Sequence, residues 1–566
     1  MHIKLLGVLL LSLCFLNCNY AAETAAFDVK DQEINALLTN LLPDAEIQEK
    51  YFALQRIRQA KDKRFIAPLV DILRFQPSRD EITEVAQTLQ TLTDFKPNQT
   101  EDLWGQMTIW LGENASLQPP VGYMAWKGEL HALLVDKRFK EFLYEGATVA
   151  EGTRVEEVVW GGVRVDGIPA LVNPKMLAAD KADYLTDAEP VFGVSINGDN
   201  RAYPLRILDW HEMANDVVGG KSVALAYCTL CGAGVLFETT IANQTFEFGS
   251  SGFLMRSNKL MYDRTTKTLW NQLTGKPVIG KLVGKNLELK VLPVVLTSWG
   301  EWKATHSDTK VLSTDTGYDR PYQVGATYGR YFASPGTMFP IWKQSRILPK
   351  KARVYAIQLD GIAKAYPLDE LNRVNGVAND KIGAKNLVVV YRDAVGRVAL
   401  SEKLRTALKS VDSSYTFAFA NDLTLAALQK LLDKQPLFIN DLTVEIMLAV
   451  PTEARLTLLN ERTTDERQGT RAEKGKFTPN FRNEVAQRGL IGETRAFERN
   501  SHSFKPTANK AELSDEKNKI WRVTEDALVS ADGEKLPRLG GHLAFWFGWF
   551  SYFSQTQVYQ AYQGNQ

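Results

Sequence analysis

One stretch of the sequence occurs twice and is the main guide to the fold. Its first copy is Val191-Phe-Gly-Val-Ser-Ile-Asn-Gly198, followed by Arg201-Ala-Tyr-Pro-Leu205. It returns as Val354-Tyr-Ala-Ile-Gln-Leu-Asp-Gly361, followed by Lys364-Ala-Tyr-Pro-Leu368. Such internal self-similarity indicates a repeated structural unit. We therefore expect two copies, at about 191–312 and 354–559, with the second enlarged by an insertion between about 405 and 510.

Each copy has the local pattern of short strands joined by tight turns. Alternation from Val191 to Ile196 predicts a strand, and Asn197-Gly198 predicts a hairpin turn. Pro204 is expected to begin a helix that runs to about Asn215. Two further strands are then predicted, which the sequence places at Val223–Tyr227 and Val235–Glu238. The expected fold class is α+β, rich in antiparallel strands.

The N-terminal region, 27–150, has a different texture. Apolar residues recur there at helical spacing, in three stripes that include Ile47, Ile66 and Ile82. Short paired helices of this kind resemble HEAT repeats, and a small helical bundle is the equally weighted alternative. We expect an all-helical, HEAT-like region, followed by two β-rich α+β pseudo-repeats at 155–345 and 350–566.

The first residues predict export. Lys4 precedes an apolar run from Leu5 to Leu16, which is shorter than the roughly 20 residues of a membrane-spanning helix. We predict a signal peptide over residues 1–22 and a periplasmic protein with no transmembrane segment in its mature chain. Lipidation at Cys18 is the weaker alternative, because the small residue expected before the cysteine is missing.

Composition narrows the possible classes of function. The chain has 566 residues, 45% hydrophobic and 23% charged, as is ordinary for globular proteins. A net charge of +1 without a basic stripe argues against a nucleic-acid partner. No phosphate-binding glycine loop occurs, so no nucleotide is expected. A protein partner could bind through the helical N-terminal region.

The chemistry is expected at a Cys-x-x-Cys pair, Cys228 and Cys231, since the other two cysteines lie in the leader. A disulfide over so short a loop contributes little stability, which argues against a structural staple. A thioredoxin-like site would continue into a long helix, and a zinc ribbon would need a second cysteine pair. Covalent haem is not expected either, because Gly232 stands where the haem motif has histidine.

His211 lies just before the cysteine strand and completes the candidate site. Two cysteines and a histidine suit a soft metal ion, copper before zinc. Such a site would need a fourth ligand, for which we considered Met213, Met255 and Met261 for copper and Asp263 for zinc.

Two other functions compete with metal binding. One is a redox dithiol at the same residues, with His211 lowering the pKa of a thiolate. The other is a non-catalytic envelope binding module. The second copy has Val374 or Asn375, Arg392 and Val395 in place of the three site residues. These residues are therefore not needed for folding.

Several motifs together resemble those of the exported bacterial family named domain of unknown function 3179. The resemblance covers most of the chain from about Val155 onward, with Thr229 standing where the family usually has proline. It implies an envelope location and makes Cys228, Cys231 and His211 the expected site, but it implies no activity. The motifs are Asn173-Pro174, Pro190-Val-Phe-Gly, Arg201-Ala-Tyr-Pro-Leu, Trp210-His-Glu, Asn215-Asp216, Tyr227-Cys-Thr-Leu-Cys-Gly, Met261-Tyr-Asp-Arg, Leu269-Trp, Thr316-Gly-Tyr and Ala544-Phe-Trp-Phe-Gly-Trp.

Overall fold

The computed structural model describes residues 29–98, 102–187, 189–323, 326–328, 331, 336–393, 406, 409 and 492–561. The chain divides into two compact units. Unit 1 holds the N-terminal residues up to Val165 together with Val278–Gly284, and unit 2 holds Asp166–Pro277 and Lys285 onward. The predicted signal peptide, residues 1–22, and the possible lipidation site, Cys18, lie outside the described residues.

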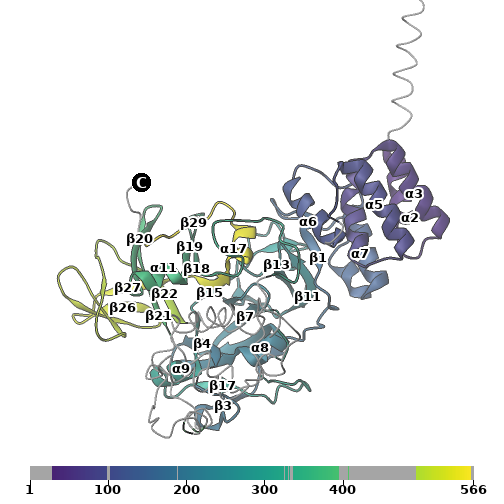
Figure 1. Ribbon diagram of the computed structural model, residues 1–566. Helices are drawn as coiled ribbons and strands as arrows, with labels where there is room; N and C mark the ends of the chain where they lie inside the picture. The colour runs from purple at the N-terminus through teal and green to yellow at the C-terminus, as the bar shows by residue number, and fades with distance from the viewer. Residues whose placement is uncertain are drawn as a thin grey trace, which may run out of the picture. The chain divides into compact units, whose positions relative to one another are not determined.

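Unit 1 is helical up to residue 134, as the apolar spacing predicts, and its helices are the purple ribbons of Figure 1. Whether they form HEAT repeats stays a prediction. The elements are α2 (Asp31–Asn40), α3 (Ile47–Ala60), η1 (Lys63–Phe65), α4 (Ile66–Leu73), α5 (Arg79–Thr93), α6 (Leu103–Glu113), α7 (Tyr123–Leu134), η2 (Lys137–Glu141), η3 (Val155–Glu157) and β1 (Val158–Trp160), with β14 (Pro277–Ile279) at its edge.

Two local features hold these helices. A capping box begins α5, where the Ser78 hydroxyl accepts from the backbone N–H of Glu81 and the Glu81 carboxylate accepts from that of Ser78. Asp71 of α4 is buried between two residues of α7. It accepts from Tyr123 Oη at 2.6 Å and from Lys127 Nζ at 2.9 Å, which satisfies both of its oxygens.

Unit 2 contains a run of short strands, β4 to β17, which we call the first segment (residues 190–312). Three short elements precede it, namely β2 (Leu171–Val172), β3 (Met176–Ala178) and η4 (Ala179–Lys181). Its own elements are β4 (Pro190–Ile196), β5 (Asp199–Pro204), α8 (Leu205–His211), β6 (Met213–Val218), β7 (Lys221–Cys228), β8 (Ala233–Glu238), β9 (Thr240–Ile241), β10 (Gln244–Thr245), β11 (Phe248–Met255), β12 (Asn258–Asp263), β13 (Leu269–Asn271), β15 (Lys290–Leu292), β16 (Val295–Ser298), α9 (Trp299–Thr305) and β17 (Lys310–Leu312).

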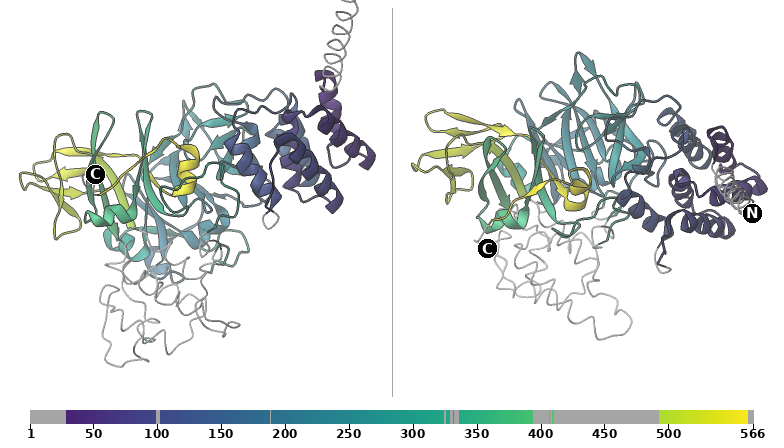
Figure 2. Two further views of the ribbon diagram at one scale, coloured as in Figure 1. Left: turned by 45° about the horizontal axis from the view of Figure 1, so that its top comes forward. Right: turned by 90° about the horizontal axis from the view of Figure 1, so that it is seen from above.

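The second segment (residues 353–558) runs from β18 to β29. Its C-terminal strands, yellow in Figure 2, lie beside the green strands β20 and β21, more than a hundred residues earlier in the chain. Its elements are β18 (Arg353–Leu359), β19 (Ile362–Pro367), α11 (Leu368–Arg373), β20 (Val377–Ile382), β21 (Lys385–Asp393), β22 (Gly492–Glu498), β23 (Lys505–Pro506), β24 (Glu512–Ser514), β25 (Ile520–Val523), β26 (Ala527–Ser530), β27 (Lys535–Leu539), β28 (His542–Phe545), α17 (Trp546–Tyr552) and β29 (Gln557–Val558).

The two segments arrange their sheets in the same order. In the first, one sheet runs β16-β4-β5-β17 and another β15-β8-β7-β6; in the second, the orders are β28-β18-β19-β29 and β27-β22-β21-β20. The last strand of each segment also pairs in parallel with the second strand of that segment, β17 with β5 and β29 with β19. Val311 pairs with Ala202, and Val558 pairs with Ala365. These are the positions that the sequence repeat aligns.

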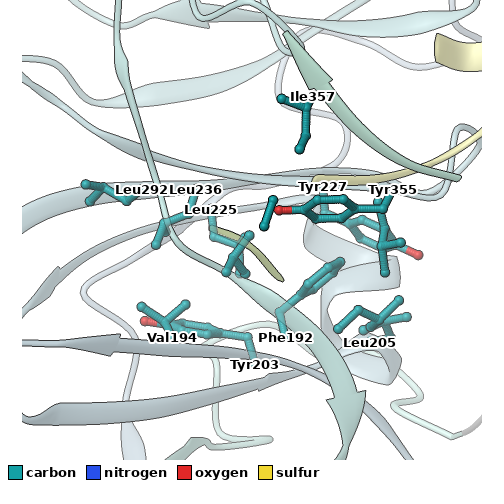
Figure 3. Close-up of a cluster of buried hydrophobic side chains, with 14 of the residues drawn as sticks. Phe192, Val194, Tyr203, Leu205, Leu225, Tyr227, Leu236, Leu292, Tyr355 and Ile357 are labelled. Atoms are coloured by element: carbon teal, nitrogen blue, oxygen red, sulfur yellow. The ribbon is translucent and has the colours of Figure 1, made fainter. Parts of the chain in front are cut away.

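One apolar core is shared by both segments. Phe192 and Tyr227 of the first segment pack with ring centroids 5.2 Å apart. Tyr355 and Ile357 of the second segment belong to the same buried cluster, as Figure 3 shows. The two predicted pseudo-repeats are therefore parts of a single compact unit, stabilised by the same burial of apolar surface.

Some boundaries differ from those predicted. The helix after Pro204 ends at His211, so Asn215 lies on strand β6 and does not share a helix face with His211. The reason is local: Glu212 has a φ of +52°, which a right-handed helix cannot continue.

The predicted insertion, 405–510, lies largely outside the described residues, but β22 already begins at Gly492. In the described part of the chain, no helix is both long and apolar enough to cross a bilayer.

Candidate functional site

Cys228 and Cys231 lie at the tip of the β7–β8 hairpin and are joined by a disulfide, with their Cα atoms 5.3 Å apart. The turn is closed by two backbone bonds, from Cys231 N to Cys228 O and from Gly232 N to Thr229 O, each 3.2 Å. Gly232 has a φ of +58°, and a Cβ there would lie 3.0 Å from the Phe545 ring. Glycine is thus required both for the turn and for the packing above it.

The second segment covers this turn. The backbone N–H of Phe545 donates to Cys231 O at 2.6 Å, and a Cβ on Gly548 would lie 3.0 Å from the Cys231 Cβ. Tyr331 Oη donates to Leu230 O at 2.6 Å. Both cysteines are consequently buried, and the aromatic block around α17 packs in the core, as its sequence predicts.

A buried pair of opposite charges lies against the same turn. Lys259 Nζ is 3.7 Å from a carboxylate oxygen of Glu212 and donates to the backbone carbonyls of Glu212 and Tyr227 at 2.5 and 3.4 Å. The Glu212 carboxylate also accepts from Tyr328 Oη at 3.3 Å. Since Tyr227 directly precedes Cys228, the bond from Lys259 to the Tyr227 carbonyl places this charge pair beside the strand that leads into the disulfide turn.

Burial shifts the proton affinities of this pair in opposite directions. It lowers the pKa of Lys259 to about 8, although the nearby Glu212 opposes that shift. It also raises the pKa of Glu212, against the charge of Lys259 and the hydrogen bond from Tyr328. Pairs of groups shifted in this way are common at functional sites.

His211 has partners on both ring nitrogens. Nδ1 lies 2.8 Å from the carbonyl oxygen of Pro169, and Nε2 lies 2.5 Å from Tyr322 Oη. A carbonyl can only accept, so Nδ1 carries the proton, and Nε2 of the neutral ring accepts from Tyr322. The Tyr322 hydroxyl can in turn accept from Thr316 Oγ1 at 2.5 Å. Burial lowers the pKa of His211, which favours this neutral form.

The structure therefore brings the two cysteines together but gives His211 other partners. In the part of the chain that it describes, Cys228, Cys231 and His211 do not form a group whose ligand atoms all lie within 4.8 Å of one another. Asp263, a candidate fourth ligand, accepts hydrogen bonds from Thr266 and Trp270. Metal binding at the cysteines stays a prediction.

Glu212 and Lys259 were missed by the sequence analysis. Glu212 follows His211 in the motif Trp210-His-Glu. A glutamate at the end of a helix is usually exposed to solvent, so its position in the sequence did not predict burial. Lys259 gave a clearer signal, because it is a single charge within the apolar strand Asn258-Lys-Leu-Met-Tyr262. Lysine is almost never fully buried unless it is paired, and here it is 3% exposed.

The sequence of the chain was also compared with known protein families. The sequence model of the family described as "Protein of unknown function (DUF3179)" matches residues 165–556. The chain belongs to this family. Comparisons with curated proteins and with solved structures found no match. The DUF3179 match includes the disulfide turn, Glu212 and Lys259, and it spans both segments of unit 2.

Within the DUF3179 region, the second segment shows what replaces this site. Tyr391 N donates to Gly376 O at 2.8 Å, as Tyr227 N donates to Glu212 O at 2.8 Å. This register places Gly376 at the position of Glu212. By the same count, Asn375 replaces His211 and Arg392 replaces Cys228. Arg392 lies 3.8 Å from Glu493, so the second hairpin holds an ion pair in place of a disulfide.

Proposed function

We propose that this protein is exported to the cell envelope and that Cys228 and Cys231 form a reversible dithiol–disulfide couple, which makes it a thiol–disulfide oxidoreductase. One observation carries the proposal. The disulfide follows Tyr227, whose carbonyl accepts a hydrogen bond from the buried Lys259, and Lys259 is itself paired with the buried carboxylate of Glu212. We further propose that the two segments are copies of one unit, of which the first alone keeps this couple.

Stability does not explain the disulfide. Closing a four-residue loop stabilises a protein by only about 2 kcal/mol on chain-entropy grounds. The buried pair Glu212–Lys259 carries a desolvation penalty as well, which often exceeds the attraction between the charges. The hairpin β21–β22 forms without either feature. Groups that the scaffold does not need are better explained by chemistry.

The proposed reaction balances with a dithiol as reductant. One thiolate of the donor attacks a sulfur of the disulfide and forms a mixed disulfide, and the donor's second thiol then displaces that bond. The donor leaves as a disulfide, while Cys228 and Cys231 take up its two electrons and two protons. Glu212 can hold a proton beside the turn, because burial raises its pKa. The reduced Cys231 thiol can donate to Ser257 O, 3.2 Å from its sulfur.

The test is a redox titration of the folded chain from residue 23 onward, in which Cys228 and Cys231 are the only cysteines. The protein is equilibrated with mixtures of reduced and oxidised dithiothreitol, quenched with acid, alkylated and weighed by mass spectrometry. We expect two thiols to appear and disappear together while the circular dichroism of the fold is unchanged. The variant Cys228→Ser/Cys231→Ser should gain no label. Thiols that appear only after unfolding would overturn the proposal.

Glu212→Gln separates a chemical role from a structural one. We expect it to slow reduction and to change how the rate depends on pH, while the number of titrating thiols stays at two. The carboxamide keeps the shape and can still accept the hydrogen bond from Tyr328. A rate and pH profile equal to those of the native chain would remove Glu212 from the proposal and leave the cysteine couple to be judged alone.

Metal binding is the second candidate, and the same samples test it. A soft ion, copper before zinc, would need the reduced cysteines and would need His211 to release Tyr322. Elemental analysis of the reduced protein should then show one equivalent of metal that is lost in Cys228→Ser/Cys231→Ser and weakened in His211→Asn. Absence of metal in the reduced native chain would reject this candidate.

A binding module is the third candidate, and one feature of unit 1 favours it. A cavity of about 200 Å³ lies among α3, α4, α5 and α7, with mostly apolar walls that include Leu54, Ile72 and Leu130. We propose this helical region as the surface for a protein partner. Cross-linking of the full chain in native envelopes, with the exposed cavity residue Leu134 changed to lysine (Leu134→Lys) as the disrupting variant, tests it: a cross-linked partner unaffected by that change would exclude this surface.

A further inference from the structure

A second cluster of metal-ligating side chains lies in the second segment, away from the cysteines in the sequence. His502, Asp515 and Glu516 place one ligand atom each so that all three lie within 4.8 Å of one another. His502 Nδ1 is 3.7 Å from Asp515 Oδ2 and 3.4 Å from Glu516 Oε1. Ligands about 2.0–2.1 Å from a tetrahedral zinc ion are about 3.3–3.4 Å apart, so little movement is needed.

The carboxylates are held with one oxygen toward the histidine. Asp515 Oδ1 accepts from the backbone N–H groups of Lys517 and Lys519, each at 2.9 Å. Glu516 Oε2 accepts from the backbone N–H of Ser503 at 2.9 Å, a bond that lowers the pKa of Glu516. The other oxygen of each carboxylate is the one nearest His502. The two negative ligands are thus fixed by the backbone before any ion arrives.

The histidine is oriented in the way that metal ligands usually are. Its Nε2 lies 3.5 Å from the carboxylate of Glu534, which is held in turn by Lys519 at 3.1 Å. A histidine that binds metal through one nitrogen commonly gives its other N–H to a carboxylate. Its Nδ1 is buried and has no hydrogen-bond partner among the described residues. A lone pair on Nδ1 would be repelled by the two carboxylates, so this arrangement needs either a proton on Nδ1 or a metal ion between the three groups.

The first segment provides an internal comparison for this cluster. There, Phe246, Phe248 and Trp270 pack with ring centroids 5.4 to 6.3 Å apart. The second segment repeats the arrangement with His502, Phe504 and Trp521, at 5.1 to 6.0 Å. His502 therefore stands at the position of a phenylalanine that serves only packing.

The acidic ligands compare in the same way. Asp263 and Asp515 each accept from the tryptophan indole at 3.1 Å, so this aspartate belongs to the shared scaffold. The next residue differs, because Arg264 follows Asp263 and Glu516 follows Asp515. Two of the three ligands are thus additions of the second segment that the scaffold does not require.

We propose that His502 Nδ1, Asp515 Oδ2 and Glu516 Oε1 bind a divalent transition-metal ion. Imidazole with carboxylates is a ligand set that suits zinc, and three protein ligands leave a position open for water or for a further group. Glu516 is partly exposed, its side chain at 42%, so an ion can reach the site from solvent. This site uses none of the residues of the proposed dithiol couple.

The experiment uses zinc as the probe and the chain from residue 23 onward in the Cys228→Ser/Cys231→Ser background, where no thiol can bind it because Cys14 and Cys18 are absent. Equilibrium dialysis with elemental analysis measures the bound zinc, and isothermal titration gives the affinity. We expect one equivalent of zinc and a raised unfolding temperature in its presence. His502→Phe restores the residue of the first segment, so it should keep the fold and lose the zinc.

Two further variants make the result specific. Glu534→Gln should weaken zinc binding by about 10- to 100-fold, as is typical for a carboxylate behind a ligating histidine. His306→Phe is the matched control, because His306 lies near a single carboxylate, Glu525, at 3.8 Å, and zinc binding should be unchanged. Equal binding in His502→Phe and its parent would overturn the proposal. So would a His502 that is simply protonated, seen by NMR as an imidazolium that zinc does not displace.

Discussion

The two segments of unit 2 share their supporting contacts and differ at the hairpin tip. Tyr203 donates to Asp216 at 2.6 Å in the first segment, and Tyr366 donates to Asp380 at 2.8 Å in the second. Asn215 exchanges two bonds with the backbone of Phe248, as Asn379 does with Phe504. These contacts are the ones that a sheet scaffold of this kind needs.

The two segments differ at the position of Glu212, where the second segment has Gly376 and the first has a side chain on a strained backbone. Gly376 has a φ of +74°, which glycine adopts freely. Glu212, at the same place in the first segment, has a φ of +52°, which costs a residue with a Cβ about 1–2 kcal/mol. The first segment carries this strain and a buried charge beside its disulfide. The comparison thus separates residues that hold the fold from residues that are retained for another reason.

The largest expected effect comes from breaking the buried charge pair of the first segment. Lys259→Met leaves Glu212 as an unpaired buried charge and should lower the free energy of unfolding by about 3–5 kcal/mol. Lys364→Met removes the partner of Asp380 in the second segment, where both side chains reach solvent, and should cost about 1 kcal/mol.

Urea denaturation of both variants measures this difference. The double variant Glu212→Gln/Lys259→Met removes both charges and should recover most of the loss. Equal costs for Lys259→Met and Lys364→Met would mean that the Lys259–Glu212 pair is no more desolvated than the Lys364–Asp380 pair.

Reduction of the disulfide should have a smaller effect. With Cys228 and Cys231 as thiols, the chain loses only the entropic gain of a four-residue loop, about 2 kcal/mol or less. The comparison is between oxidised and reduced native chain in urea, which leaves the side chains unchanged. A loss of 4 kcal/mol or more, on the scale of about 4.7 kcal/mol for a 100-residue loop, would make the disulfide a structural element after all.

A hydrogen bond that is present in both segments should contribute less to the free energy of unfolding, and its contribution should differ between the two segments. Trp302 Nε1 donates to Thr309 Oγ1 at 2.7 Å, and Trp549 Nε1 donates to Thr556 Oγ1 at 2.9 Å. Thr309→Val leaves a buried indole N–H unpaired, which costs about 1–3 kcal/mol. Thr556 is more exposed, so water can replace its hydroxyl and Thr556→Val should cost under about 1 kcal/mol. Thermal unfolding that ranks the two in the reverse order would contradict this burial argument.

The smallest effect is the pH dependence that His211 adds to the first segment. Burial lowers the pKa of His211, so the unfolded chain binds a proton first as the pH falls below about 6.5. Stability from the neutral ring is present above that pH and declines toward the lowered pKa of the folded state.

His211→Asn introduces the residue found at this position in the second segment, and it should flatten the curve of unfolding free energy between about pH 6.5 and 5. His131 and His542, with pKa values lowered by burial to about 3 and 4, contribute equally to both proteins. Parallel curves for variant and native chain would show that His211 does not titrate in this range.

Much of this fold could be predicted from the sequence, because its signals are local. The turns at Asn197-Gly198 and Asp360-Gly361 have positive φ at both residues, as the residue types require. The helical stripes and the strands around the cysteines are where periodicity predicts them. The end of α8 could not be predicted, since the left-handed Glu212 is imposed by its buried partners and a glutamate gives no sign of it.

The candidate sites were predictable only in part, for a related reason. A Cys-x-x-Cys pair is visible because its members are adjacent in the chain. Lys259 meets Glu212 across two strands, and His502 meets Asp515 and Glu516 through a hairpin, so only the folded chain brings them together. The role of His211 stays a prediction, because closeness in sequence does not determine the direction in which a ring points. His211 points to Tyr322.

The position of the hairpin tip also determines where additional residues can be inserted into the chain. Cys228 pairs with Ala233 across a turn of four residues, and Arg392, at the position of Cys228, pairs with Glu493 in the second segment. The longer connection therefore leaves and re-enters the sheet between adjacent strands, so its ends are already joined. Loop closure penalises length only logarithmically, by roughly 3 kcal/mol for going from four residues to about a hundred. A hairpin end of this kind accepts new chain at low thermodynamic cost, which makes it the natural point for fusing or excising a domain in this protein.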